Sequence, residues 1–226
     1  MKLTPIVALT AAAAGALWLA PARSDEAVRL VPPPAPDTPL VKSPVTATAV
    51  LAGGCFWGLE GMFEHVVGVK SVRSGYAGGI SATAHYEVVG SGLTGHAESV
   101  EIKYDPSRIS YGRLLQIYFS VAHDPTQLNR QSPDSGSQYR STIFAQDAGQ
   151  ARLATAYVAQ LNRAHTYGKP VVTTVETGKA FYPAEAYHQN FLKLNPTYPY
   201  IVVNDMPKIA ALKQVFPALY SPTPVG

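Results

Sequence analysis

The sequence predicts an α+β fold, a two-layer sandwich around a mixed β-sheet with a reactive cysteine at a helix N-terminus. Stretches with strand and helix periodicity interleave without alternating strictly, and consecutive strand-like stretches fall between the first and second helices. Strict alternation would instead favour a doubly wound parallel sheet. In addition, an apolar run over 47–52 leads into Gly53-Gly54-Cys55, after which helical spacing begins.

The elements follow from the spacing of apolar residues. Leu59, Met62, Phe63 and Val66 mark a helix after Cys55. Strand-like stretches come next, at 69–78, 86–89 and 97–104. A helix is then expected over 110–122, a long polar loop over 123–138, a strand over 139–145, and a helix with the core stripe Leu153, Tyr157 and Leu161. A β-branched strand over 171–177 and short helices over 184–192 and 208–216 complete the pattern.

The N-terminal region is expected to be a targeting segment followed by a linker. Residues 1–22 have the pattern of a signal peptide, with basic Lys2, an alanine-rich apolar stretch and small residues before Arg23. An uncleaved membrane anchor is the alternative, although the stretch is short for a span. Proline-rich residues 23–45 favour an extended linker. We therefore expect an exported, periplasmic protein whose catalytic domain covers residues 46–226.

The composition limits the classes of partner. The chain has 226 residues, of which 46% are hydrophobic and 15% charged, enough apolar material for a core. The net charge is only +3 and the basic residues are scattered, so we expect no nucleic-acid partner, and we expect a monomer. Cys55 is the only cysteine. Exported proteins usually pair their cysteines, and a solitary thiol therefore calls for an explanation.

Cys55 has the setting of a reactive thiol. A helix that opens at this residue would direct unpartnered backbone N–H groups and the positive end of its dipole toward the sulfur. Those forces are expected to lower the thiol pKa and favour the nucleophilic thiolate. A free thiol without consequence is the alternative.

Three kinds of function remain open from residue chemistry alone. Cys55 could serve a Cys/His hydrolase or acyltransferase, with His85, His96, His123 or His188 as the base. It could instead carry redox chemistry without acyl transfer. The third possibility is a non-enzymatic exported binding module with an incidental thiol.

Glu98 and an aromatic pair are the other candidates for chemistry. At strand period Glu98 falls on the same face as Val100 and Ile102, where desolvation would raise its pKa and keep it protonated near neutrality. A solvated carboxylate at the sheet end is the alternative. Phe56 and Trp57 could form an apolar cage beside the sulfur that suits a methyl or thioether group, or could simply pack in the core.

An ordered series of motifs adds specificity. They are Gly54-Cys-Phe-Trp-Gly58, Ser74-Gly-Tyr-Ala-Gly-Gly79, Tyr86-Glu-Val-Val89, Thr94-Gly-His-Ala-Glu98, Tyr104-Asp-Pro106, His123-Asp-Pro-Thr-Gln127, Asp134, Gln138-Tyr-Arg-Ser141 and Tyr187-His-Gln189. Over roughly residues 48–195 the chain resembles the peptide methionine sulfoxide reductase A family.

The resemblance implies a role for each catalytic residue. Cys55 would attack the sulfoxide sulfur, and Glu98 would donate a proton to the sulfoxide oxygen. Tyr86 and Tyr139 would hydrogen-bond that oxygen. The product at the enzyme would be a Cys55 sulfenic acid.

The resemblance also implies how substrate and reductant are used. Phe56 and Trp57 would hold the methyl group of the S epimer, and Asp134 would contact the substrate backbone region. The substrate would be methionine sulfoxide, free or in oxidised proteins under repair. Many relatives carry further cysteines near the C-terminus, whereas this sequence has none after Cys55. An external thiol, either a thioredoxin-like protein or a small molecule, would therefore reduce the sulfenic acid, and we expect neither a metal nor an organic cofactor.

Overall fold

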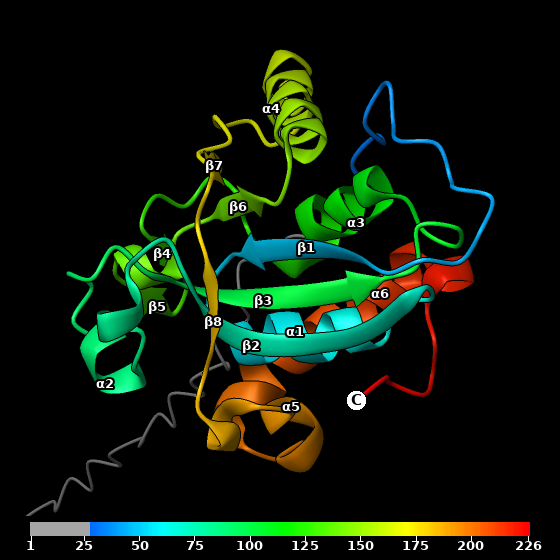
Figure 1. Cartoon of the computed structure of the whole chain (residues 1–226). Coiled ribbons are helices and arrows are strands. Elements are labelled where there is room, and N and C mark those ends of the chain that lie inside the picture. The colour runs from blue at the N-terminus through cyan, green and yellow to red at the C-terminus, as the bar shows by residue number, and fades with distance from the viewer. Residues whose placement is uncertain (1–27) are drawn as a thin grey trace, which may run out of the picture.

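A six-stranded mixed sheet forms the centre of the computed structural model, which describes residues 28–226 (Figure 1). The strand order is β7-β6-β1-β3-β2-β8, and every neighbouring pair is antiparallel except β6 with β7. The strands are β1 (Ala47–Ala52), β2 (Val69–Ala77), β3 (Ala97–Tyr104), β6 (Thr142–Ala145), β7 (Thr174–Thr177) and β8 (Phe181–Pro183). The expected α+β class with a mixed sheet is confirmed.

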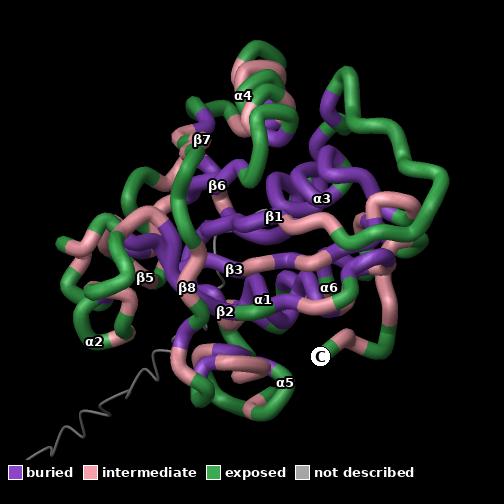
Figure 2. The backbone as a smooth tube through the Cα atoms, in the orientation of Figure 1, coloured by how far each residue is buried: buried purple, intermediate pink, exposed green. Residues whose placement is uncertain are grey.

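Helices cover mainly one face of this sheet. The longer ones are α1 (Phe56–Glu64), α3 (Tyr111–Ile117, continued by the π-helical turn η2, Tyr118–Ala122), α4 (Ala148–Arg163) and α6 (Met206–Val215). Their apolar side chains join Leu51, Val100 and Ile102 of the central strands in one large core cluster. Figure 2 shows this burial along β1, β3, α1 and α3. The opposite face holds a small cluster around Phe144.

Two predicted elements differ from the structure. The stretch 86–89, predicted as β-prone, is the helical turn α2 (Tyr86–Val89). No strand among residues 28–226 pairs with it, and the Glu185 carboxylate instead accepts a hydrogen bond from the Tyr86 N–H at 3.0 Å, so tertiary contacts outweigh the β-propensity of its valines. The helix predicted over 184–192 is two short turns, η4 (Ala186–His188) and α5 (Phe191–Leu194), interrupted by Asn190 in a left-handed conformation.

The loop over 123–138 contains a small two-stranded hairpin, β4 (Arg130–Gln131) with β5 (Asp134–Ser135), followed by the 3₁₀ turn η3 (Ser137–Tyr139). The apolar periodicity of the sequence does not predict strand β8 or this hairpin. The strands are too short to show a period, since β4 and β5 have two residues each and β8 has three.

The described part of the proline-rich segment lies against the domain. Val31 is fully buried, and its carbonyl accepts a hydrogen bond from the Gln116 side chain at 2.7 Å. The Pro32 carbonyl accepts one from the Tyr157 hydroxyl at 2.6 Å. Residues 28–46 belong to no helix or strand, and these contacts dock the segment over α3 and α4. The predicted signal peptide over residues 1–22 lies outside the described residues. Within 28–226, no helix has the length and apolar character needed to cross a membrane.

Candidate active site

A tight turn places Cys55 at the start of α1. Cys55 is the N-cap residue of this helix, which agrees with the sequence-based expectation. Gly54 has a φ of +91°, and a Cβ at that position would lie 2.6 Å from Gln131 Cγ. Only glycine combines that backbone conformation with such a close approach. The turn therefore brings the sulfur to the helix N-terminus and the loop of β4 and β5 beside it.

A small pocket of about 180 Å³ opens over the sulfur. Its lining residues are Cys55, Phe56, Trp57, Tyr86, Glu98, Asp134, Tyr139 and Tyr200. These comprise all seven site residues predicted from the sequence together with one that was not predicted, Tyr200. The pocket thus joins residues from α1, α2, β3, the hairpin and the C-terminal region.

Glu98 is a buried carboxyl group with a raised pKa. Only 3% of the residue is exposed, and its Oε2 accepts a hydrogen bond from the Phe56 N–H at 3.1 Å. Burial raises the Glu98 pKa to about 8, with a further contribution from Asp134, while the Phe56 N–H opposes the shift. The carboxyl group is consequently mostly protonated at neutral pH, as predicted from its place on the strand.

The Cys55 thiol behaves differently from the expectation that the helix terminus lowers its pKa. Burial raises this pKa well above the ordinary value, and the negative charges of Glu98 and Asp205 raise it further. The Trp57 N–H hydrogen-bonds the sulfur and lowers the pKa. That expectation is wrong, because one N–H donor and the helix dipole do not offset desolvation and the neighbouring carboxyl groups.

Two tyrosines provide neutral hydroxyl donors in the pocket. Tyr86 comes from α2 and Tyr139 from η3. Burial raises the pKa of Tyr86 to about 12 and also raises that of Tyr139, and the charge of Glu98 adds to both shifts. Both phenols therefore keep their protons near neutrality and can donate hydrogen bonds to an oxygen atom.

The aromatic wall is held in place from behind. The Trp57 Nε1 donates to His188 Nδ1 at 3.1 Å, and the Trp57 ring stacks on Phe191 with centroids 3.8 Å apart. Phe56 is buried and packs against His188, with ring centroids 5.0 Å apart. These contacts fix the orientation of both rings, so the pocket has a preformed apolar side.

Tyr200 links the C-terminal region to the pocket. Its hydroxyl donates to Asp134 Oδ2, and its ring lies edge-on to Trp57 with centroids 6.1 Å apart. Tyr200 lies 145 positions after Cys55 in a segment without a distinctive pattern, Pro199-Tyr200-Ile201. No local signal in the sequence marks it.

The candidate histidines lie elsewhere. None of His85, His96, His123 and His188 lines the Cys55 pocket. Burial lowers the pKa of His123 to about 3, and its Nε2 lies 2.7 Å from Ser141 Oγ. His188 accepts its hydrogen bond from Trp57. Among residues 28–226 there is also no group of three or more His, Cys, Asp or Glu arranged to hold a metal ion.

Comparison with known proteins agrees with this geometry. The family model described as peptide methionine sulfoxide reductase matches residues 47–219. The chain is 65% identical over 183 residues to peptide methionine sulfoxide reductase MsrA 2 of Mesorhizobium japonicum, covering 81% of this chain and 94% of that protein. It is 51% identical over 190 residues to the MsrA 2 protein of Synechocystis, covering 83% and 89%.

Solved structures lead to the same family. Methionine sulfoxide reductase A of Corynebacterium diphtheriae matches with a TM-score of 0.62 and 33% identity, covering 70% of this chain and 78% of that one. Reduced Mxr1 of Saccharomyces cerevisiae matches with a TM-score of 0.61 and 33% identity, covering 70% and 94%. The chain therefore belongs to the peptide methionine sulfoxide reductase A family and is an oxidoreductase that reduces methionine sulfoxide.

Proposed function

We propose that this enzyme reduces the S epimer of methionine sulfoxide, free or in proteins, through a Cys55 sulfenic acid. The observation that carries the proposal is the protonated Glu98 at the helix N-terminus beside Cys55, in a pocket that is also lined by the phenols Tyr86 and Tyr139 and the rings of Phe56 and Trp57. A sulfoxide oxygen leaves poorly unless it is protonated. The pocket combines an acid, a nucleophile and hydroxyl donors within one small volume.

The atoms balance without an added group. Glu98 donates its proton to the sulfoxide oxygen while Tyr86 and Tyr139 polarise the S–O bond. The Cys55 sulfur attacks the sulfoxide sulfur, and its thiol proton passes to the Glu98 carboxylate. The hydroxyl group then transfers to the Cys55 sulfur as the substrate S–O bond and the transient S–S bond break. The substrate sulfur is reduced by two electrons and the Cys55 sulfur is oxidised by two. Methionine leaves, and the enzyme holds a sulfenic acid with Glu98 again protonated.

The presence of both apolar rings and hydroxyl donors in the pocket gives a basis for choosing one epimer. Phe56 and Trp57 would hold the methyl group, while the oxygen faces Glu98 and the two phenols. Asp134, fixed by Tyr200, would contact the substrate backbone region. With the oxygen and methyl directions both fixed, only one configuration at sulfur leaves the third substituent pointing out of the pocket. The resemblance to the family indicates the S configuration.

Recycling would require an external thiol, because Cys55 is the only cysteine in the sequence. A first thiol would condense with the sulfenic acid, releasing water and forming a mixed disulfide, and a second thiol would free Cys55. A thioredoxin-like protein or a small thiol would fill this role. No metal or organic cofactor is part of the proposed reaction.

The proposed setting is the periplasm, where the enzyme would act as a monomer on oxidised methionines of envelope proteins. The signal-peptide pattern over residues 1–22 supports export. We expect a cleaved precursor with a mature N-terminus near Arg23. N-terminal sequencing of exported material tests this, and recovery of a detergent-requiring protein with the original terminus would favour a membrane anchor instead.

The direct test offers both epimers of a methionine sulfoxide substrate with dithiothreitol as reductant. We expect stoichiometric conversion of the S epimer to methionine and little conversion of the R epimer. Chromatography measures the methionine formed from each epimer. A preference for the R epimer would contradict the proposed arrangement of the pocket. A Cys/His hydrolase would hydrolyse ester or amide substrates. We expect the same preparation to leave these substrates intact.

A further inference from the structure

Glu60 is a buried carboxyl group of α1 that the proposed reaction does not use. Only 1% of the residue is exposed, and its Oε2 accepts hydrogen bonds from the Ser74 hydroxyl at 2.9 Å and from the Asn190 N–H at 3.0 Å. Its Oε1 is buried without a hydrogen-bond partner among residues 28–226. Because burying an unpaired polar atom is costly, this group calls for a role in the fold or in the site.

One face of α1 carries Glu60 together with Trp57 and Gly61, at the spacing i, i+3 and i+4. The short helix α5 packs on this face. At one point Glu60 accepts the backbone N–H of Asn190, the N-cap residue of α5, whose φ is +55°. At the next point, a Cβ at Gly61 would lie 2.8 Å from Leu192 Cδ1. The start of α5 is therefore anchored to α1 by one polar and one apolar contact.

Phe191, the residue between those two contacts, supports the aromatic wall of the pocket. Its ring stacks on Trp57 with centroids 3.8 Å apart and planes 11° from parallel. Tyr198 lies edge-on to both rings, with its centroid 5.5 Å from that of Phe191 and 6.3 Å from that of Trp57. A continuous path thus runs from the Glu60 carboxyl group through the backbone of Asn190 to the ring behind Trp57.

We propose that Glu60 is a positioning residue that holds Phe191 against Trp57 and thereby limits the size of the group that the pocket accepts on the substrate sulfur. Glu60 does not line the pocket and acts through the start of α5. This role rests on the proposed function, in which Phe56 and Trp57 hold the methyl group. A supported ring leaves less room for a longer alkyl group, and one extra methylene in an apolar site typically changes kcat/KM by roughly 10–200-fold. Glu60 therefore contributes to the selection of a methyl sulfoxide.

The test compares kcat/KM for methionine sulfoxide and for its ethyl homologue, both in the S configuration and with dithiothreitol as reductant. The parent should prefer the methyl substrate by at least roughly tenfold. Glu60→Leu keeps the approximate size of the side chain but removes the acceptor of the Asn190 N–H, and it should narrow this preference to about threefold or less. The methyl substrate should lose mainly through a higher KM, since the contact with its methyl group is a binding contact. Glu60→Gln retains an oxygen that can accept both hydrogen bonds and should keep the parent preference.

A second readout follows the position of the Trp57 ring without any substrate. In a Trp18→Phe background Trp57 is the only tryptophan of the chain, so the tryptophan fluorescence reports this ring alone. Acrylamide should quench the fluorescence more strongly in Glu60→Leu than in the parent, because the ring loses the cover of Phe191. In Glu60→Gln the quenching should match that of the parent.

Glu64→Leu is the matched control for the loss of a buried carboxyl group. Glu64 also belongs to α1 and is 2% exposed, but among the described residues it makes no hydrogen bond to α5, unlike Glu60. This variant should leave both the methyl preference and the quenching at their parent values. Equal effects of Glu60→Leu and Glu64→Leu would overturn the proposal, because the effect would then come from the loss of any buried carboxyl group.

Phe191→Leu keeps the proposal testable even if Glu60→Leu does not fold. It removes the ring behind Trp57 directly and should narrow the methyl preference and increase the quenching, as Glu60→Leu does. The double variant should resemble Phe191→Leu alone, since both changes act on the same contact. An unchanged methyl preference in Phe191→Leu, or parent-like quenching in Glu60→Leu, would refute the proposed role of Glu60. Absence of sulfoxide turnover in the parent would instead count against the proposed function, and the quenching series would still show whether Glu60 places the Trp57 ring.

Discussion

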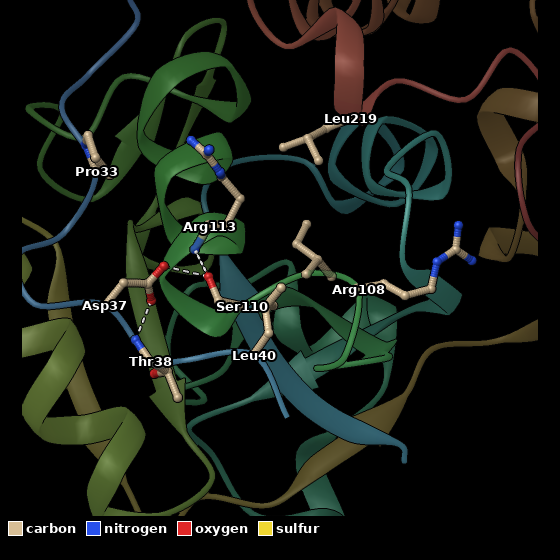
Figure 3. Close-up of a pocket in the computed structure, with 9 residues that line it drawn as sticks. Pro33, Asp37, Thr38, Leu40, Arg108, Ser110, Arg113 and Leu219 are labelled. Atoms are coloured by element: carbon tan, nitrogen blue, oxygen red, sulfur yellow. Dashed lines mark hydrogen bonds between the residues drawn. The ribbon is translucent and has the colours of Figure 1, made fainter. Parts of the chain in front are cut away.

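Two of the pockets formed by residues 28–226 differ in what their polar groups do. The pocket over Cys55 measures about 180 Å³, whereas a gap under the proline-rich segment measures about 340 Å³. Figure 3 shows the larger one, where Asp37 bonds Ser110 and Thr38, and the side chains of Arg108 and Arg113 extend away from it in different directions. In the smaller one, buried acid, thiol and phenol groups converge on a shared space.

The difference shows that the convergence of buried ionisable groups, and not volume, marks the chemical site. In the gap, Ser110 caps α3 by accepting from the Arg113 N–H at 3.0 Å, and Asp37 accepts from the Ser110 hydroxyl. These polar groups satisfy one another and hold the segment against the helix. In the Cys55 pocket, burial holds the pKa values of Cys55 and Glu98 above their usual range, which leaves both groups ready for proton and oxygen transfer.

The largest expected effect comes from Cys55→Ser. Serine keeps the size of the side chain but cannot accept oxygen from a sulfoxide, so turnover should disappear. The melting temperature should stay close to that of the parent, since the sulfur contributes little to the core. Activity is measured as methionine released, and stability by thermal unfolding. Turnover near the parent rate would remove Cys55 from the reaction.

Glu98→Gln should have the next largest effect. The amide keeps the hydrogen bond from the Phe56 N–H but cannot donate a proton as an acid. Loss of a positioned general acid should slow the reductive step by roughly 10²–10⁴. Low pH should relieve part of the loss, because solvent can then protonate the oxygen. Single-turnover measurements at neutral pH decide the matter, and an unchanged rate would exclude Glu98 as the acid.

The pH dependence of kcat/KM in the parent enzyme should report the ionisation of Glu98. Glu98 acts in its protonated form, and its pKa of about 8 places that form in excess below this pH. The kcat/KM for sulfoxide should therefore fall as the pH rises through about 8, by up to tenfold per unit. Glu98→Gln should lack this alkaline limb. A parent profile that is flat from pH 7 to about 10 would contradict a raised pKa at Glu98.

The contrast between the pockets also explains which parts of the molecule were predictable. The Cys55 helix and the Glu98 face of β3 follow from the periodicity of adjacent residues, and the structure confirms both. The sign of the Cys55 pKa shift depends first on burial and then on the charges of Glu98 and Asp205, and Asp205 is 150 positions away in the chain. Long-range contacts of this kind leave no local pattern, and Tyr200 was missed for the same reason.

The proline-rich segment illustrates the same limit. Its composition predicts an extended chain outside helices and sheets, and residues 28–46 belong to no helix or strand. Composition says nothing about the Gln116 and Tyr157 side chains that bond the carbonyls of Val31 and Pro32. Proline lacks a backbone N–H group, so a proline-rich segment has few N–H donors that need an acceptor. Such a segment can therefore dock mainly through its carbonyl oxygens, which accept hydrogen bonds.

The smallest expected effect belongs to the gap under this segment, and it should be an effect on stability alone. Ser110→Ala removes the cap of α3 and should lower the free energy of unfolding by about 1 kcal/mol. Asp37→Ala, which removes the partner of Ser110, should cost less, because the cap itself remains. The double variant should cost less than the sum, since the two residues share one hydrogen bond. Urea unfolding measures these values, and kcat/KM for sulfoxide should stay at the parent value in all three variants. A fall in kcat/KM without a loss of stability would mean that the gap takes part in function, and the distinction drawn between the two pockets would no longer hold.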